Sequence, residues 1–361
     1  MRIAIIHDWL RRSSENGRTG TAGFHDPLEF DLLAELDLIR TTLAKAGHEA
    51  VVFAAEDPKR LCDFLATHHP HLIFNLCDTL AGSAALEMNV AALFELLGIA
   101  YTGCPPLALG ISLNKALAKS ILTANGIRTP AYAVIDQGQD LYAARDLKFP
   151  LIVKPLAEDA SVGIDDGAVV NDMGALAKRV KFLRREFRQP ALVEEFIAGR
   201  EFCVSVLAAS PTDFVALPIV EISFDRLPPG RPHIFGYEAK WDPTASFNHM
   251  VATRCPAKIN AKTADEIKSV ALAVARTVGL RDYGRVDFRL REDDQALFVL
   301  EVNPNPDLSD ECAFMRSAQA SGRTTEGTIC EIVERAIERC DWLPRKAKAP
   351  LPRKAKVQNA A

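Results

Sequence analysis

Two apolar segments near the C-terminal end, Arg285–Leu290 and Ala296–Val302, predict an antiparallel β-hairpin that carries charged residues. The first segment contains Asp287. The second segment contains Glu301 and is followed directly by Asn303. These two residues are two positions apart and therefore lie on one face of a strand. A carboxylate in an otherwise apolar strand needs a partner or a metal ion. Two carboxylates and an amide oxygen are hard oxygen ligands, so the pattern predicts a Mg²⁺ site that also binds nucleotide phosphates.

The N-terminal part alternates between strand-like and helix-like patterns. Strands are predicted at Arg2–Ile6, Ala50–Ala54 and His71–Leu76, and helices at Phe30–Ala46 and Leu61–His68. Alternation of this kind is typical of a doubly wound α/β unit. The full length of 361 residues suits two or three packed units.

The composition excludes several classes of protein. Lys and Arg number 43 against 47 Asp and Glu, a net charge of −4, so we expect no nucleic-acid or membrane partner. The eight cysteines form no C-x-x-C pair, which argues against a zinc site or a disulfide framework. No apolar run approaches the ~20 residues of a membrane-spanning helix, and the N-terminal MRIAIIHDWL is too short for a signal peptide. We therefore expect a soluble, cytoplasmic protein.

Two polar segments are predicted to lie at the surface. Arg11–Phe24 is rich in Gly and would form a loop over the strand ends. The near-copies Leu343–Ala349 and Leu351–Val357 are rich in Pro and Lys and too poor in apolar residues to bury a core. They predict a disordered basic tail.

Several lysines are placed to hold phosphates. Lys154 ends the apolar strand Leu151–Lys154, and the loop Glu158–Gly163 that follows would fold over phosphates through its backbone N–H groups. Lys115 and Lys240 are further cationic candidates. Taken alone, each lysine fits a solvent-facing charge better than a phosphate ligand.

The segment Val193–Glu201 combines an acidic pair with a chain hinge. Such a pair can hydrogen-bond ribose hydroxyls while the neighbouring backbone contacts an adenine edge. A strand end followed by a Gly turn is the alternative interpretation, and the segment by itself does not decide between them.

Taken in order, these features resemble the ATP-grasp superfamily and, within it, the D-alanine–D-alanine ligase family. The resemblance extends from Leu72 to Gly322. The matching segments are LFELLGIAYTG (93–103), LNKALAKSILTANGIRTP (113–130), FPLIVKP (149–155), SVG (161–163), LVEEFIAGREF (192–202), YEAKW (237–241), GRVDFRL (284–290) and LEVNPNP (300–306).

The resemblance implies a mixed α/β and α+β fold, in which two α+β subdomains clasp ATP behind a doubly wound α/β domain. The implied boundaries are 1–112 for the N-terminal α/β domain, 113–209 for the central subdomain, 210–342 for the C-terminal subdomain with the Mg²⁺ site, and 343–361 for the basic tail.

The resemblance also implies how ATP is bound. Lys115 and Lys154 would contact the phosphates, and Lys240 would approach them from the C-terminal subdomain. Glu201 would hold the ribose. The hinge residues would bind the adenine end, with the first and the last of them beside the ring: Glu194, Glu195, Phe196 and Ile197.

The implied reaction is the joining of a carboxylate to an amine through an acyl phosphate, with release of ADP and phosphate. Arg285 would face the transferred phosphoryl group and the tetrahedral intermediate, and Ser161 and Lys240 would complete the catalytic set. Two Mg²⁺ ions, or Mn²⁺ in their place, would be held by the polar residues of the hairpin: Asp287, Glu301 and Asn303.

The substrate side departs from the family pattern. Where D-alanine ligases carry a His-Gly pair, this chain has Cys77 and Asp78. Where they carry a Gly and then a substrate-binding Ser after the metal-binding Asn, it has Asp307 and Cys312. The N-terminal Glu that contacts the first D-alanine has two candidate counterparts, Glu29 and Glu35.

Three functions stay open on this pattern. The first is a D-alanine–D-alanine ligase-like enzyme that acts on another amino acid or carboxylic acid. The second is a true D-alanine–D-alanine ligase of peptidoglycan synthesis with a divergent pocket. The third is a catalytically degenerate ATP-binding regulatory protein. The resemblance also suggests a homodimer.

Overall fold

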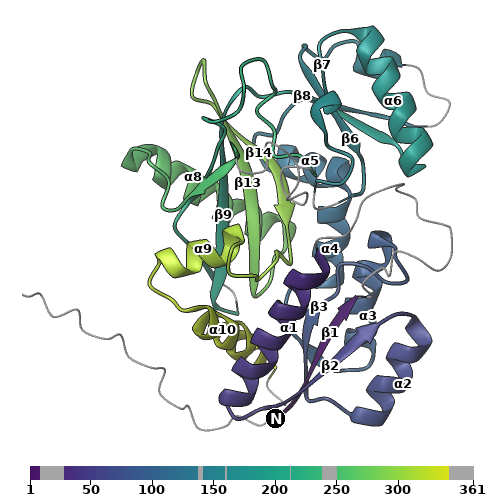
Figure 1. Cartoon of the computed structure of the whole chain (residues 1–361), viewed down its shortest axis with the longest axis vertical. Helices are drawn as coiled ribbons and strands as arrows, with labels where there is room; N and C mark the ends of the chain where they lie inside the picture. The colour runs from purple at the N-terminus through teal and green to yellow at the C-terminus, as the bar shows by residue number, and fades with distance from the viewer. Residues whose placement is uncertain (9–27, 137–140, 159–160, 212, 238–249, 341–361) are drawn as a thin grey trace, which may run out of the picture.

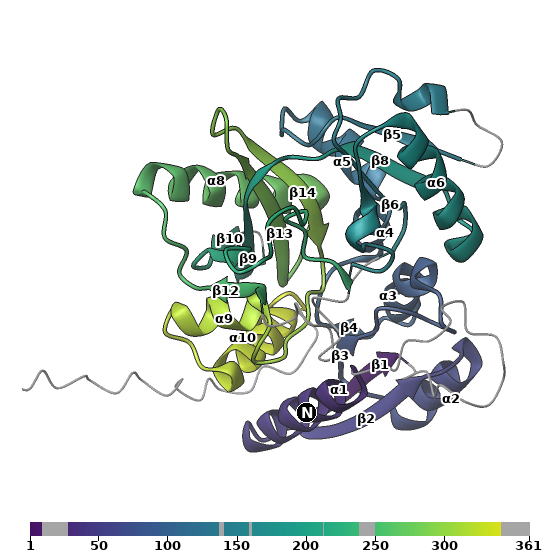
Figure 2. The same ribbon diagram turned by 45° about the horizontal axis from the view of Figure 1, so that its top comes forward.

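The computed structural model describes residues 1–8, 28–136, 141–158, 161–211, 213–237 and 250–340, with no side-chain description for 28–32. The predicted loop Arg11–Phe24 and the tail from residue 343 therefore lie outside the described residues. So does Lys240. Three sheets form three lobes (Figure 1), and Figure 2 shows the same lobes from a second direction.

The N-terminal lobe is a parallel sheet in the order β2–β1–β3–β4, as the alternating pattern predicts. Ile3 and Ile5 pack on one face with α1, whereas Ala4 and Ile6 pack on the other face with α2 and α3. Both faces are thus covered, which explains the continuous apolar run of β1. The elements are β1 (Arg2–Asp8), α1 (Leu28–Lys45), β2 (Glu49–Ala55), α2 (Pro58–His68), β3 (Leu72–Leu76), a 3₁₀ turn (Ala84–Leu86), α3 (Glu87–Leu96) and β4 (Ala100–Tyr101).

The central lobe is an antiparallel sheet in the order β5–β8–β6–β7, with α6 packed against it. Two helices lead into it, and α5 lies between this sheet and β14 in both views (Figures 1 and 2). The elements are α4 (Pro106–Leu113), α5 (Lys115–Ala124), β5 (Tyr132–Ile135), β6 (Leu151–Pro155), β7 (Val169–Val170), α6 (Met173–Phe187) and β8 (Ala191–Glu195), with 3₁₀ turns at Leu141–Ala144 and Asp166–Ala168.

The C-terminal lobe is a larger sheet in the order β12–β11–β9–β13–β14, with β10 paired to β9. The chain changes sheets at 196–198, so β9 belongs to this sheet, and the predicted boundary after residue 209 falls near the end of β9. The elements are β9 (Gly199–Ser210), β10 (Asp213–Ala216), β11 (Val220–Ser223), β12 (Ala252–Arg254), α8 (Ala261–Val278), β13 (Tyr283–Arg291), β14 (Leu297–Asn303), α9 (Ala313–Ala320) and α10 (Thr325–Glu338).

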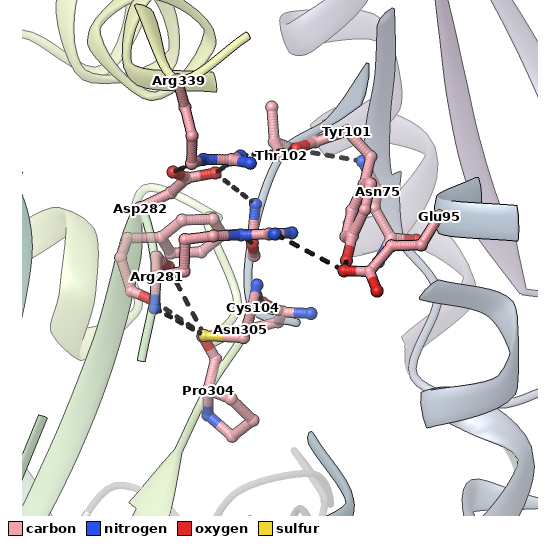
Figure 3. Close-up of polar contacts among 12 residues, drawn as sticks. Asn75, Glu95, Tyr101, Thr102, Cys104, Arg281, Asp282, Pro304, Asn305 and Arg339 are labelled. Atoms are coloured by element: carbon pink, nitrogen blue, oxygen red, sulfur yellow. Dashed lines mark hydrogen bonds and ion pairs between the residues drawn. The ribbon is translucent and has the colours of Figure 1, made fainter. Parts of the chain in front are cut away.

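A polar junction joins the N-terminal and C-terminal lobes (Figure 3). The Asp282 carboxylate accepts hydrogen bonds from the Gly103 backbone N–H at 2.9 Å and from Arg339 Nη2 at 2.8 Å. The Cys104 backbone N–H donates to Asn305 Oδ1 at 2.9 Å. Gly103 has φ +90°, and a Cβ there would lie 2.5 Å from Asn305 Oδ1, so only glycine permits this approach. We call these five residues the Gly103 junction.

In the described part of the chain, no helix combines the length and the apolar character that crossing a bilayer requires.

Candidate active site

The β13–β14 hairpin is antiparallel, as the sequence predicts, and its register pairs Asp287 with Glu301 and Arg285 with Asn303. Asn303 Nδ2 donates to Asp287 Oδ2 at 3.0 Å, which leaves the amide oxygen of Asn303 as an acceptor. Among the described residues, no three His, Cys, Asp or Glu side chains gather as a metal site. The predicted metal site contains two carboxylates, and it has three oxygen ligands only if the amide oxygen of Asn303 is the third.

Arg285 is held by the same carboxylate. Its Nε and Nη2 donate to the two oxygens of Asp287 at 2.8 and 2.9 Å, a bidentate pair that fixes the guanidinium plane. Burial alone would lower the pKa of Arg285, but Asp287 more than offsets that and raises it above its usual value. Arg285 therefore carries a permanent positive charge beside the hairpin carboxylates.

Lys115 links the hairpin to α5. Asn114 caps this helix by accepting from the Leu117 backbone N–H at 3.1 Å, which sets Lys115 at the start of the first turn. The Lys115 ammonium forms an ion pair with Glu301 Oε1 at 2.7 Å and also donates to the Glu158 carbonyl. A predicted phosphate ligand and a predicted metal ligand are therefore direct neighbours.

Glu194 on β8 lies between two lysines. Its Oε1 is 2.5 Å from Lys119 Nζ, and its Oε2 is 2.8 Å from Lys154 Nζ. Burial would raise the pKa of Glu194, but the two ammonium groups lower it below its usual value. Burial lowers the pKa of Lys119, and the Glu194 carboxylate opposes that shift. The buried cluster thus holds two positive charges and one negative charge.

Lys119 was not among the residues that sequence reasoning selected. The signal was present, because Lys119 lies four residues after Lys115 and therefore on the same face of the helix. A chain of contacts runs from Lys154 through Glu194 to Lys119 and on to the Leu300 carbonyl, 3.3 Å from Lys119 Nζ. It ends one residue before Glu301, so Lys154 and the hairpin belong to one site.

The hinge between β8 and β9 is fixed by backbone contacts. The Phe196 N–H donates to the Pro150 carbonyl at 2.9 Å, and the Glu195 carboxylate accepts from the Lys148 N–H at 3.0 Å. Ile197 is buried. The predicted adenine-binding residues therefore form a well-defined edge, with Glu195 turned toward the start of β6.

Glu201, the predicted ribose ligand, is engaged by Arg289 on the neighbouring strand β13. Arg289 Nη2 and Nε donate to Glu201 Oε2 at 2.6 and 2.9 Å, and Nη1 donates to the Ile197 carbonyl at 3.2 Å. The second carboxylate oxygen, Oε1, is not used by this pair. Arg289 was another residue that the sequence pattern did not select.

The loop after β6 contacts the C-terminal lobe. Ser161 has φ +62°, and its hydroxyl donates to the Phe235 carbonyl at 3.0 Å. The Tyr237 N–H donates to the Ile164 carbonyl at 2.9 Å. The loop therefore bridges the two lobes that flank the lysine and carboxylate cluster, which is the placement expected of a cover over bound phosphates.

The predicted substrate residues separate into two groups. Cys77 is only 1% exposed and packs in the core, so its thiol is not offered to a substrate, whereas Asp78 beside it is exposed. Asp307 and Cys312 lie together, and the Cys312 thiol donates to Asp307 Oδ2 at 2.6 Å. Burial and the Asp307 carboxylate raise the pKa of Cys312 to about 12, so the thiol stays protonated.

Glu35 on α1 lies near this second group. Burial and the charge of Asp307 raise the pKa of Glu35 from 4.5 to about 8, although a hydrogen bond from the Leu308 backbone opposes the shift. The side chain of the other N-terminal candidate, Glu29, is outside the described residues. Glu35 is thus an acidic group that is largely neutral at pH 7.

Replacing this carboxyl is expected to change how stability depends on pH. The folded protein holds the Glu35 proton to about pH 8, whereas the unfolded chain loses it near 4.5, so the free energy of unfolding falls between these values. Glu35→Gln should therefore raise the melting temperature above wild type near pH 9, with the difference vanishing toward pH 4. Exposed Glu49→Gln is the control. A Glu35→Gln effect of equal size at both ends of the pH range would contradict the assignment.

Comparisons with known proteins identify the family to which this sequence is similar. Residues 121–334 match the family model described as the D-ala D-ala ligase C-terminus. A D-alanine–D-alanine ligase of Bordetella petrii is 33% identical over 299 residues, which cover 82% of this chain and 85% of that protein. An uncharacterised protein of Sinorhizobium fredii, y4sG, is 32% identical over 311 residues, 84% of this chain and 87% of the relative.

A solved structure shows the same fold. The D-alanine–D-alanine ligase of Bacillus anthracis complexed with ATP superposes with a TM-score of 0.70 at 22% identity, covering 93% of this chain and 97% of that one. The ATP-grasp fold expected from the sequence is thereby confirmed. From the matched family model and the identity to curated relatives, the chain belongs to the D-alanine–D-alanine ligase family of ATP-grasp ligases.

Proposed function

We propose that the protein uses ATP to phosphorylate a carboxylate and joins the resulting acyl group to an amine. The observation that carries this proposal is the single contact chain that links Lys154, Glu194, Lys119 and the strand bearing Glu301. It brings buried positive charge to the carboxylates of the hairpin, as the binding of a triphosphate requires.

The donor set fits a magnesium ion. Asp287 and Glu301 are cross-strand partners, and the amide oxygen of Asn303 is left as an acceptor beside them. These three residues would hold Mg²⁺, or Mn²⁺ in its place, with two ions as the number that the family resemblance suggests. When bound, the metal supplies positive charge that offsets the charge of the nucleotide phosphates.

The side chains have distinct parts in the reaction. Lys115 and Lys154 would neutralise phosphate oxygens as the γ-phosphoryl group passes to the substrate carboxylate. The carboxylate thereby gains a leaving group, the amine attacks the acyl carbon, and phosphate departs. Arg285, oriented by Asp287, would stabilise the oxyanion of the tetrahedral intermediate. The Ser161 loop and the segment with Lys240 would exclude water, which otherwise hydrolyses the acyl phosphate.

We propose that the carboxylate substrate, the amine substrate or both differ from D-alanine. Asp307 and Cys312, held together by a 2.6 Å contact, stand where the family carries Gly and Ser. A true D-alanine–D-alanine ligase is the second candidate, and it is favoured by the name of the Bordetella petrii relative. Release of ADP by the purified protein, measured with a panel of D- and L-amino acids and small carboxylic acids, distinguishes the two. Turnover with D-alanine alone would select the second, and ATP binding without turnover would leave a regulatory protein.

Cys312→Ser is expected to change the acceptor preference and to leave ATP binding nearly unchanged. The serine hydroxyl is smaller than the thiol and is a stronger hydrogen-bond donor toward Asp307. We expect kcat/KM for the acceptor to shift by about tenfold, the effect of one altered polar contact. An equal loss of ATP affinity would show that Cys312 belongs to the nucleotide half of the site.

We also propose a cytoplasmic homodimer. Leu96 on α3 and Leu107 on α4, two helices in contact, are 84% and 70% exposed, and a second copy of the chain bound there would cover both side chains. Light scattering after size-exclusion chromatography measures the mass of the particle. Leu96→Asp together with Leu107→Asp should convert a dimer into a monomer, and a wild-type mass of one chain would reject the proposal.

A further inference from the structure

We infer that Lys119 is a positioning residue of the nucleotide site, one that fixes Glu194 and through it aims the Lys154 ammonium at the ATP phosphates. This inference rests on the proposed ATP site, and it gives a role to a buried charge that the reaction itself does not use. Lys119 would act without touching the nucleotide.

The ammonium of Lys119 is already surrounded by protein acceptors. It donates to Thr129 Oγ1 at 2.8 Å and to the Leu300 carbonyl oxygen at 3.3 Å, and it forms an ion pair with Glu194 Oε1 at 2.5 Å. Two of its three N–H donors are therefore used by Thr129 and Leu300, and Glu194 supplies the opposite charge. The side chain is also 2% exposed, less than the side chains of Lys115 and Lys154, which are 5% and 8% exposed.

The Lys154 ammonium, by contrast, has fewer protein contacts. Within the described residues, the one ionic partner of its ammonium is Glu194 Oε2 at 2.8 Å. Two of its three N–H donors therefore remain for phosphate oxygens. Because Lys119 occupies the other oxygen of Glu194, the carboxylate is shared, and the pair of ammonium groups carries one positive charge in excess of Glu194.

Removing Lys119 would change that balance. Glu194 would then have Lys154 as its single counter-ion. The full electrostatic attraction of the buried carboxylate would act on the Lys154 ammonium. Lys154 would be drawn toward β8 and away from the phosphates. The contact between Lys119 and Leu300 would also be lost, and with it one tie between α5 and the strand that carries Glu301.

The test compares ATP with adenosine, since only ATP has the phosphates that Lys154 would meet. In Lys119→Met, isothermal titration calorimetry should show Kd for ATP, measured with Mg²⁺, rising about 10- to 100-fold, the loss of one charge-assisted contact. Kd for adenosine should change by less than about threefold. Lys262→Met, at an exposed lysine on α8, is the matched control and should leave both values unchanged.

A second variant separates positioning from folding. Lys119→Met leaves Glu194 and Lys154 as a one-to-one ion pair, so its melting temperature should fall only through the lost contacts with Thr129 and Leu300. The double variant Lys119→Met with Glu194→Gln leaves the buried Lys154 ammonium without a counter-ion, so it should melt lower than the single variant. It should not recover ATP affinity, because Lys154 then has no carboxylate to hold it, and a similar loss of affinity in both variants would follow the position of Lys154 and not the stability of the fold.

Three outcomes overturn the inference. They are wild-type ATP affinity in Lys119→Met, equal losses for ATP and adenosine, and recovery of ATP affinity in the double variant. If wild type binds ATP and any of these is found, the proposed function stands and Lys119 is a purely structural residue. If wild type itself binds no ATP, the proposed function fails, and this inference fails with it.

Discussion

Glu301→Ala should reduce ATP-dependent turnover by about 10³-fold or more, the range seen when a charge-stabilising group is lost from a phosphoryl-transfer site. Glu301 faces Asp287 across the hairpin and pairs with Lys115 at 2.7 Å. The substitution therefore removes a proposed metal ligand and leaves a buried ammonium without that carboxylate. Release of ADP in a coupled assay measures the loss.

Two further variants make this result interpretable. Glu301→Gln keeps the shape of the side chain and removes its charge, so it should be nearly as inactive as Glu301→Ala while melting closer to wild type. Glu292→Ala removes an exposed carboxylate at the other end of the same hairpin and should be fully active. Wild-type turnover by Glu301→Gln at limiting Mg²⁺ would contradict a metal-binding role.

Gly199→Ala should destabilise the protein by about 2–6 kcal/mol, the sum of about 1–3 for backbone strain and about 1–3 for overpacking. Gly199 has φ +145°, and a Cβ there would lie 2.1 Å from the Leu290 carbonyl oxygen and 3.0 Å from the Glu292 nitrogen. Both obstacles are backbone atoms, so neither can rotate away. Urea unfolding measures the free energy directly.

Gly279→Ala is the matched control for this prediction. Gly279 ends α8 with φ +80°, but nothing lies within 4 Å of the position of a Cβ. The free energy of unfolding of Gly279→Ala should therefore fall only by the backbone-strain contribution, about 1–2 kcal/mol. If the two variants were equally stable, the close approach of β9 to β13 at Gly199 would be wrong.

The hairpin and the lysines could be predicted from the sequence, because the patterns that indicate them lie within short segments of the chain. Alternation and spacing fix which side chains of β14 share a face, and this placed Glu301 and Asn303 correctly. A lysine at the end of an apolar strand is equally visible. The parallel N-terminal sheet followed from its strand–helix alternation for the same reason.

The ion pairs between side chains could not be predicted from the sequence, because they join segments that are distant in the chain. Nothing in the spacing of Lys119 indicates that it meets Glu194, and nothing near Glu201 indicates Arg289. Cys77 shows the converse case. The family resemblance suggested a pocket residue there, but the direction of a side chain just beyond a strand depends on how that turn packs, and here the side chain packs into the core.

The Gly103 junction has a consequence for the catalytic cycle. With Asp282 bound to both Gly103 and Arg339, and Asn305 bound to Cys104, the first and last lobes form one stiff frame. We therefore expect the nucleotide side to open by a movement of the middle sheet about 196–198, which would break the Ser161–Phe235 contact. The acceptor side, built on the frame, would stay assembled between turnovers while the nucleotide side opens and shuts.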